Sequence, residues 1–267
     1  MVRTSVVGYP RIGRNRELKK LVEDYLGGRI SRTELKTGSR ALREAHWSIQ
    51  RAKGIDWIPS NDFSYYDHVL DVAMVLNVIP ARYRALGDPL DVYFAMARGH
   101  QDGRHDLKAL ELKKWFNTNY HYIVPEIDAE SEFRLNAAKI LEEYEEAKTL
   151  GIKTKPVLIG AYTFLRLARI KALGKNWEDH LTPIAEVYGQ LLQRLAFHGV
   201  ELVQLDEPGL VLDLNKEEKA GFIALYRKIL AQKNGVRILL QTYFGDVRDI
   251  YQDLMTLDFD IIGLDFI

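Results

Sequence analysis

The side chains best suited to chemistry stand in residues 115–126, with the sequence WFNTNYHYIVPE. This stretch combines aromatic rings, amides, a histidine and a carboxylate, and the alternation of Tyr120, Tyr122 and Val124 predicts a strand. Its polar groups hydrogen-bond in two directions or titrate near neutral pH. An aromatic-rich sheet edge explains the same pattern without any function, so both interpretations stay open.

A second candidate is the turn after the first predicted strand, residues 8–20 (GYPRIGRNRELKK). Two glycines and a proline shape the turn, and a helix is predicted to start inside it. The helix N-terminus favours anions, yet this one carries five cations, at Arg11, Arg14, Arg16, Lys19 and Lys20. Such a cluster is explained if it binds an anion, for instance a polycarboxylate or a phosphate. A solvated charged face is the alternative.

Carboxylates also stand at or near the ends of predicted strands, at Glu126, Asp206, Glu207 and Asp265. In a parallel barrel such strand ends meet at one face, so these groups could converge on one cavity. Glu126 and Glu207 would suit a barrel glycosidase if their carboxylates stood about 5–9 Å apart.

The second predicted strand is followed by residues that we interpret as structural. Residues 60–62 are expected to cap the next helix. Asp67 and His68 are placed inside that helix, where neighbouring side chains point in different directions.

Composition narrows the function classes. The 37 basic and 37 acidic residues balance, which gives no global charge to attract nucleic acid or an anionic membrane. There is no cysteine, and the seven histidines show neither an HxH nor an HExxH spacing, so we predict no metal site within this chain. A P-loop, a GxGxxG motif and a serine nucleophile elbow are also missing. No apolar run reaches the ~20 residues of a membrane span, so a cytoplasmic protein is expected.

Short apolar runs alternate with helical patterns, which predicts an α/β fold with a parallel sheet. The predicted strands are residues 4–8, 55–59, 120–125, 156–160, 201–206, 237–243 and 260–266. The predicted helices are residues 16–26, 31–53, 65–76, 107–115, 137–150, 183–197, 216–232 and 247–255. A (β/α)8 TIM-type barrel has eight strands, so we expect a barrel truncated before its eighth strand, with a complete open sheet as the alternative.

Four motifs carry a resemblance to a known family: GYPRIG with RELK (residues 8–13 and 16–19), IPSNDFSYYDH (58–68), KWFNTNYHY (114–122) and QLDEP (204–208). In this order they closely resemble the N-terminal domain of cobalamin-independent methionine synthase. That family consists of two duplicated barrels and transfers the methyl group of 5-methyltetrahydropteroyltri-L-glutamate to homocysteine, without cobalamin.

The resemblance implies that residues 1–267 are one N-terminal barrel domain that helps to bind the anionic polyglutamate tail of the folate. It places this role on Arg16, Glu17, Leu18, Lys19 and Lys114. It also implies that zinc and most contacts to homocysteine belong to a second barrel absent from this chain, so the chain alone should be inactive. Where the second barrel carries a His-x-Cys zinc motif, this chain has Gln241-Thr242-Tyr243.

Three hypotheses therefore stand after the sequence alone. The first is the tail-binding part of a methyltransferase, the second a glycosidase that uses Glu126 and Glu207, and the third a non-catalytic scaffold barrel. The roles of Asp206, Glu207, His121 and Glu126 stay open.

Overall fold

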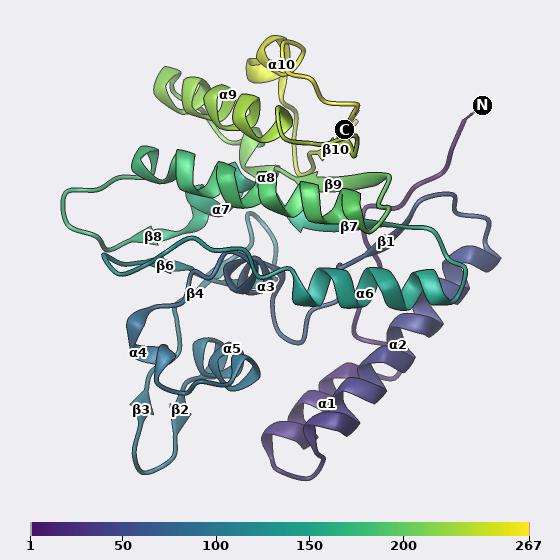
Figure 1. Cartoon of the computed structure of the whole chain (residues 1–267), viewed down its shortest axis with the longest axis vertical. Coiled ribbons are helices and arrows are strands. Elements are labelled where there is room, and N and C mark those ends of the chain that lie inside the picture. Colours follow the sequence, from purple (N-terminus) through teal and green to yellow (C-terminus); the bar gives the residue numbers. More distant parts are fainter. Residues whose placement is uncertain (1, 267) are drawn as a thin grey trace. The chain divides into compact units, whose positions relative to one another are not determined.

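The computed structural model describes residues 2–266 and divides the chain into two compact units (Figure 1). Unit 1 comprises Met1–Tyr65 and Lys139–Val157, and unit 2 comprises Tyr66–Ala138 and Leu158–Ile267. Helices and parallel strands alternate over much of the chain, which confirms the predicted α/β class.

Unit 1 consists mainly of three helices and a parallel strand pair: α1 (Glu17–Leu26), α2 (Arg32–Ala52), α6 (Ala138–Thr149), β1 (Ile58–Ser60) and the first four residues of β7 (Thr154–Ile159). A reciprocal capping box starts α2, because Ser31 accepts the Glu34 amide and Glu34 accepts the Ser31 amide. Trp47 of α2 packs on Ile58 and Ile152, which joins the helix to the strand pair.

The predicted first strand, residues 4–8, is wrong as a full strand. Its only ladder contact among the described residues is an isolated parallel bridge between Ser5 and Trp57. The segment is mostly exposed, and Val2 and Val7 remain in solvent. An apolar pattern becomes a regular strand only when neighbours cover it, and here that cover is missing.

Unit 2 contains the remaining elements. Its helices are α3 (His68–Val75), α4 (Ala81–Arg84), α5 (Pro89–Arg98), α7 (Ala161–Leu167), α8 (Leu181–Phe197), α9 (Lys216–Leu230) and α10 (Arg248–Leu254), with 3-10 turns η1 (Glu178–His180) and η2 (Pro208–Val211). Its strands are β2 (His100–Gln101), β3 (Asp106–Leu107), β4 (Leu112–Lys114), β5 (His121–Ile123), β6 (Glu126–Ile127), β8 (Arg169–Ile170), β9 (Leu202–Asp206), β10 (Arg237–Gln241) and β11 (Ile261–Gly263).

The main sheet of unit 2 is parallel, in the order β7-β9-β10-β11. All five residues of β9 are buried, and so are the three central residues of β10. Burial of successive residues means that both sheet faces are covered, as the continuous apolar runs predicted. Parallel strands that alternate with helices and are buried on both faces are consistent with a TIM-type barrel, in which helices cover the outer face and side chains fill the interior.

The predicted helix over residues 107–115 is wrong. Residues 112–114 form β4, which pairs antiparallel with β5 in the register Lys114↔His121. The strand predicted at residues 120–125 exists as β5, but it lies in this hairpin rather than in the parallel sheet. Leu107, Leu110 and Trp115 imitate a helical spacing, and only the pairing partner distinguishes the two structures.

Within residues 2–266, no helix combines the length and the apolar character that crossing a membrane requires.

Candidate functional site

The cation-rich turn of unit 1 has a defined backbone. Gly13 has φ +82° and Arg16 has φ +63°, and the Arg16 amide donates to the Gly13 carbonyl at 3.3 Å. A left-handed conformation at a non-glycine residue costs of the order of 1 kcal/mol. The chain therefore maintains local strain at Arg16, directly before α1.

Glu17 and Leu18 have structural contacts in this turn. The Glu17 carboxylate accepts the Asn15 backbone amide at 2.9 Å and the Asn15 side-chain amide at 3.0 Å. Backbone hydrogen bonds from Glu17 itself and from Asn15 hold the pKa of Glu17 below its usual value, so the helix begins with a carboxylate. Leu18 is buried, and its amide donates to the Ile12 carbonyl. The anion expected at this helix N-terminus is thus supplied in part by the chain itself.

The cations predicted to bind the folate tail are exposed. Arg16 and Lys19 lie on the surface of unit 1, and Lys114 lies on the surface of unit 2 in β4. Lys19 is 3.5 Å from Glu23, but both side chains are about half exposed, and such pairs contribute little. Among residues 2–266, Arg16 and Lys114 form no ion pair with a carboxylate. These charges remain available to a polyanion.

Asp62 attaches the start of the turn to unit 1. Its carboxylate accepts the Tyr9 amide at 2.7 Å, and the Tyr9 ring packs on His46. Burial raises the pKa of Asp62 to about 6, while the Tyr9 hydrogen bond opposes this shift. The sequence predicts that residues 60–62 cap the following helix, and this prediction is wrong. Asp67 caps this helix instead, from the position before α3, by accepting the Leu70 amide at 2.9 Å.

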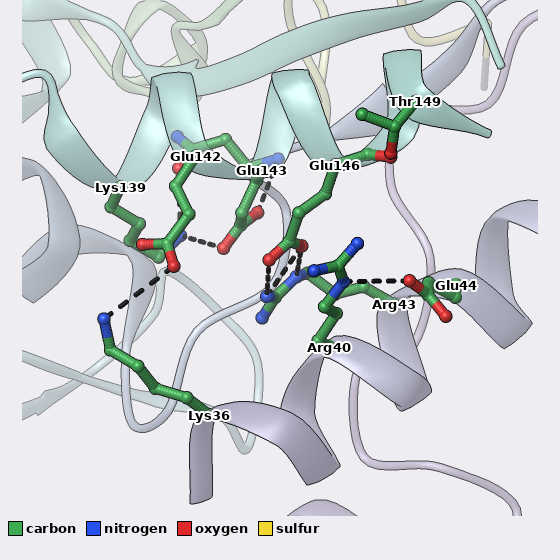
Figure 2. A network of polar contacts seen from close by, with 10 residues as sticks. Lys36, Arg40, Arg43, Glu44, Lys139, Glu142, Glu143, Glu146 and Thr149 are labelled. Atoms are coloured by element: carbon green, nitrogen blue, oxygen red, sulfur yellow. Dashed lines mark hydrogen bonds and ion pairs between the residues drawn. The ribbon is translucent and has the colours of Figure 1, made fainter. Parts of the chain in front are cut away.

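A polar network joins helices α2 and α6 within unit 1 (Figure 2). Arg43 donates two parallel hydrogen bonds of 2.8 Å to Glu146, and both side chains are about nine-tenths buried. Glu143 accepts the Asn61 amide at 3.0 Å and pairs with Lys139 at 3.0 Å. No local sequence pattern indicates this network, because Arg43 and Glu146 lie about a hundred residues apart.

The aromatic stretch at residues 115–126 is largely explained by structure. Tyr120 donates to the Asp67 carboxylate at 2.9 Å, and the Ile123 amide donates to it at 3.1 Å. His68 packs against the rings of Trp115 and Tyr120. Trp115, Tyr120 and Ile123 thus fasten the β4–β5 hairpin to α3, which supports the structural interpretation for this part of the stretch.

Glu207 is a fully buried anchor. Its carboxylate accepts the amides of Tyr162 at 2.9 Å and Thr163 at 2.7 Å, together with the Tyr226 hydroxyl. It therefore caps α7 from a distant part of the chain, while Gly160 precedes that helix without a side chain. A Cβ on Gly160 would stand 2.1 Å from the Glu207 carboxylate. Burial raises the pKa of Glu207 to about 7 against these hydrogen bonds.

Each of the other strand-end carboxylates has its own partners, and their convergence on one cavity stays a prediction. Glu126 pairs with Arg82 and with Lys171, each at 2.7 Å. Burial raises its pKa, but these two cations outweigh burial and lower it overall. Glu207 is fully buried, and both of its carboxylate oxygens accept hydrogen bonds within the fold, so it cannot reach a substrate. A glycosidase needs two accessible carboxylates, so we set that hypothesis aside. Asp265 accepts the Phe244 amide, and Asp206 accepts from Gln204.

Gln241, Thr242 and Tyr243 do not fit a zinc site. The Gln241 side chain donates to the Thr242 carbonyl, and the Thr242 hydroxyl donates to the Gly263 carbonyl. Burial raises the pKa of Tyr243 well above its usual value, so the phenol stays protonated. Zinc prefers thiolate, imidazole and carboxylate ligands, which this segment does not offer.

Two cavities are candidate ligand sites, one beside the cation-rich turn and one in unit 2. One, of about 10 Å³ beside Tyr9 and Asp62, has room for a single water molecule. The other, of about 420 Å³ in unit 2, is lined by residues 210–213 and 246–249, which include three aspartates. The first is too small for a folate tail, and the second is lined by three aspartates, which repel an anion.

A cluster of possible metal ligands lies in unit 2, at residues that the sequence does not predict as a site. His100, Asp102 and His105 place one ligand atom each within 4.8 Å of one another. Their H-x-D-x-x-H spacing is neither of the two motifs sought, and it becomes meaningful only when a tight hairpin closes between β2 and β3.

We predict that Gly13→Ala lowers the free energy of unfolding by about 2 kcal/mol. The new Cβ would stand 2.2 Å from the Glu17 carboxylate, which would have to leave Asn15. Gly28→Ala is the matched control, because Gly28 has φ +68° with nothing within 4 Å, so only backbone strain of about 1 kcal/mol applies. Equal losses in urea unfolding of the two variants would show that Glu17 does not organise the turn.

Comparison with known proteins relates this geometry to a family. The model of the cobalamin-independent synthase N-terminal domain matches residues 3–267. A 5-methyltetrahydropteroyltriglutamate–homocysteine methyltransferase from Bifidobacterium animalis subsp. lactis is 52% identical over 99% of this chain. The enzyme of the same name from Streptococcus gordonii is 49% identical over 99% of the chain. This chain spans 35% of the length of each of these relatives.

Solved structures agree on the fold. A B12-independent methionine synthase from Shewanella sp. W3-18-1 aligns with a TM-score of 0.63 at 16% identity, covering 88% of this chain and 65% of that one. A Listeria monocytogenes protein assigned as a vitamin-B12-independent methionine synthase aligns with a TM-score of 0.66 at 13% identity, covering 100% of this chain and 74% of that one. The family match over nearly the whole sequence confirms the resemblance drawn from the four motifs. The chain belongs to the family of cobalamin-independent synthase N-terminal domains.

Proposed function

We propose that this chain is the polyglutamate-binding N-terminal domain of a methyltransferase that moves the methyl group of 5-methyltetrahydropteroyltri-L-glutamate to homocysteine. The observation that carries the proposal is the identity of about half over 99% of the chain to relatives with that name. The domain would comprise residues 1–267 and act in the cytoplasm.

The tail site would use the exposed cations Arg16, Lys19 and Lys114. A triglutamate tail carries several carboxylates, and guanidinium and ammonium groups bind carboxylates through charge-assisted hydrogen bonds. Glu17 and Leu18 would act indirectly, since Glu17 holds Asn15 and Leu18 anchors α1 in the core. Strain at Arg16 supports this assignment, because strained residues cluster at binding sites.

The chemistry of methyl transfer would lie outside this chain. Zinc, where the second barrel binds it, would activate the homocysteine thiolate as the nucleophile, and no cobalamin takes part. The segment Gln241-Thr242-Tyr243 has no thiolate or imidazole, in keeping with a barrel that binds substrate but holds no zinc there. We therefore expect no methyl transfer by this chain alone.

Lys19→Ala and Lys114→Ala test the proposal. Each variant removes one cation from the tail site, and we expect triglutamyl 5-methyltetrahydrofolate to bind about fivefold more weakly, which corresponds to about 1 kcal/mol. The monoglutamyl form should bind both variants as it binds the unchanged protein, because it lacks the distal carboxylates. Calorimetric titration measures both affinities.

Lys36→Ala is the matched control. Lys36 is an exposed lysine of α2 that pairs with Glu142, and its loss should leave both affinities unchanged (Figure 2). If Lys19→Ala and Lys114→Ala bind the triglutamyl form as tightly as Lys36→Ala does, the tail does not use these cations. A scaffold role for the domain would then be favoured.

A further inference from the structure

Strands β2 and β3 form a two-stranded hairpin in unit 2 (Figure 1). This hairpin brings three metal-ligating side chains together. The strands pair antiparallel with His100 opposite Leu107 and Gln101 opposite Asp106, which leaves residues 102–105 as the connecting turn. The Asp102 amide donates to the His105 carbonyl and closes this turn. The cluster therefore depends on six consecutive residues and on a single local fold.

The Asp102 carboxylate is oriented by the turn. Its Oδ1 accepts the amides of Arg104 at 2.9 Å and His105 at 2.8 Å. Its Oδ2 then faces His100 Nε2 and His105 Nδ1, each at 3.2 Å. Outer hydrogen bonds that fix a carboxylate in this way are typical of the supports around metal ligands.

The spacing of the ligand atoms matches a small coordination sphere. Bonds of about 2.0–2.2 Å from a tetrahedral Zn²⁺ place its ligand atoms about 3.3–3.6 Å apart. The Asp102 carboxylate stands 3.2 Å from each imidazole, close to these values, and all three ligand atoms lie within 4.8 Å of one another, so rotation of the histidine side chains would complete the site. Two imidazoles and one carboxylate are a ligand set that zinc and its neighbouring transition metals accept.

We propose that His100, Asp102 and His105 form a binding site for a divalent transition-metal cation of the zinc class. Their side chains are 31–40% exposed, so an ion can enter from solvent, and water can complete its coordination. The site would join the two ends of the β2–β3 turn. Hard cations such as Mg²⁺ demand more oxygen ligands than the cluster has, so the site selects against them.

Calorimetric titration of the untagged chain with ZnCl₂ tests this proposal, with MgCl₂ as the hard-cation comparison. We expect one saturable zinc site and no binding of magnesium. Asp102→Asn is the most informative variant, because an asparagine oxygen can still accept the two turn amides while the charged ligand is lost. Asp102→Asn and His105→Ala should each weaken zinc binding at least tenfold, since the loss of a ligand costs no less than the loss of an outer-shell partner.

His198→Gln is the matched control, since it removes a partly exposed histidine at the end of α8, outside the cluster. Its zinc affinity should equal that of the unchanged chain. Co²⁺ provides a second readout, because its visible absorption reports tetrahedral coordination and should disappear in His105→Ala. Absence of a saturable zinc site, or zinc binding that survives both cluster substitutions, would overturn the proposal. Folate binding takes no part in this test, so either proposal can fail alone.

Discussion

Replacing Glu207 with alanine is expected to lower the free energy of unfolding by about 3–5 kcal/mol, one of the two largest effects that we predict. The change removes the acceptor for two buried amides, those of Tyr162 and Thr163, and for the Tyr226 hydroxyl. Each buried donor left without an acceptor costs about 1–3 kcal/mol. Urea unfolding followed by circular dichroism measures the loss.

Glu207→Gln separates the roles of shape and hydrogen bonding. Glutamine fills the same space, but its amino group must face either the Tyr162 or the Thr163 amide, so one donor loses its partner. We expect a loss of about 1–3 kcal/mol, smaller than that of alanine. If Glu207→Ala were as stable as the unchanged protein, the cap on α7 would contribute nothing to folding.

The pH dependence of Glu207 has a defined sign. Its pKa rises from an ordinary value of 4.5 to about 7 on folding, so the folded state binds the proton more tightly than the unfolded state does. The resulting stability is complete below pH 4.5 and is lost as the pH rises through 7, in total about 3 kcal/mol. Glu207→Gln cannot titrate, so its deficit relative to the unchanged protein should shrink between pH 5 and pH 8. Asp62 titrates in an overlapping range, but its effect cancels in this difference.

The second large effect is expected from Arg43→Ala in unit 1. Arg43 and Glu146 form a bidentate pair about nine-tenths buried, and removal of the arginine leaves Glu146 without its charge partner (Figure 2). Burial raises the pKa of Glu146 while Arg43 opposes this shift, so the carboxylate depends on its partner to stay charged. We expect the free energy of unfolding to fall by about 3–5 kcal/mol.

Arg40→Ala is the control for Arg43→Ala. Arg40 pairs with Glu44 on the same helix, at 2.9 Å, but in a largely exposed position. An exposed pair of this spacing contributes about 0.3–0.5 kcal/mol. The double variant Arg43→Met/Glu146→Leu should recover much of the loss, since apolar groups can replace a buried ion pair at little cost. If Arg40→Ala and Arg43→Ala lower the free energy of unfolding equally, burial does not make the Arg43–Glu146 pair more important than the exposed pair.

Local patterns explain which elements could be predicted from the sequence. Strands β9 and β10 follow from continuous apolar runs, and helices α2 and α9 follow from amphipathic patterns that begin with capping boxes at Ser31 and Asn215. Helix α7 was missed because its cap is Glu207, more than forty residues away. Residues 107–115 have a helical spacing of apolar residues, and the strand β5 that pairs with residues 112–114 lies in a later segment, so the local pattern predicts a helix.

The candidate site likewise has some features that are visible in one segment of sequence and others that depend on distant residues. The sequence located the exposed cations, because charge and its position along a helix are visible in one segment. It could not show that the Glu17 carboxylate holds Asn15, or that Asp62 anchors Tyr9 from across unit 1. The cluster of His100, Asp102 and His105 was likewise hidden until the hairpin register brought its ligand atoms together. Contacts that depend on tertiary pairing leave no periodic signal in the sequence.

The most direct test of the central claim is titration of this chain with 5-methyltetrahydrofolate that carries one glutamate or three. If the chain carries the tail site, the triglutamyl form binds more tightly, and its advantage falls as salt is raised from 50 to 500 mM, because exposed cations are screened. Equal affinities for the two forms, an advantage that salt does not change, or no binding of either form would contradict a tail site on Arg16, Lys19 and Lys114.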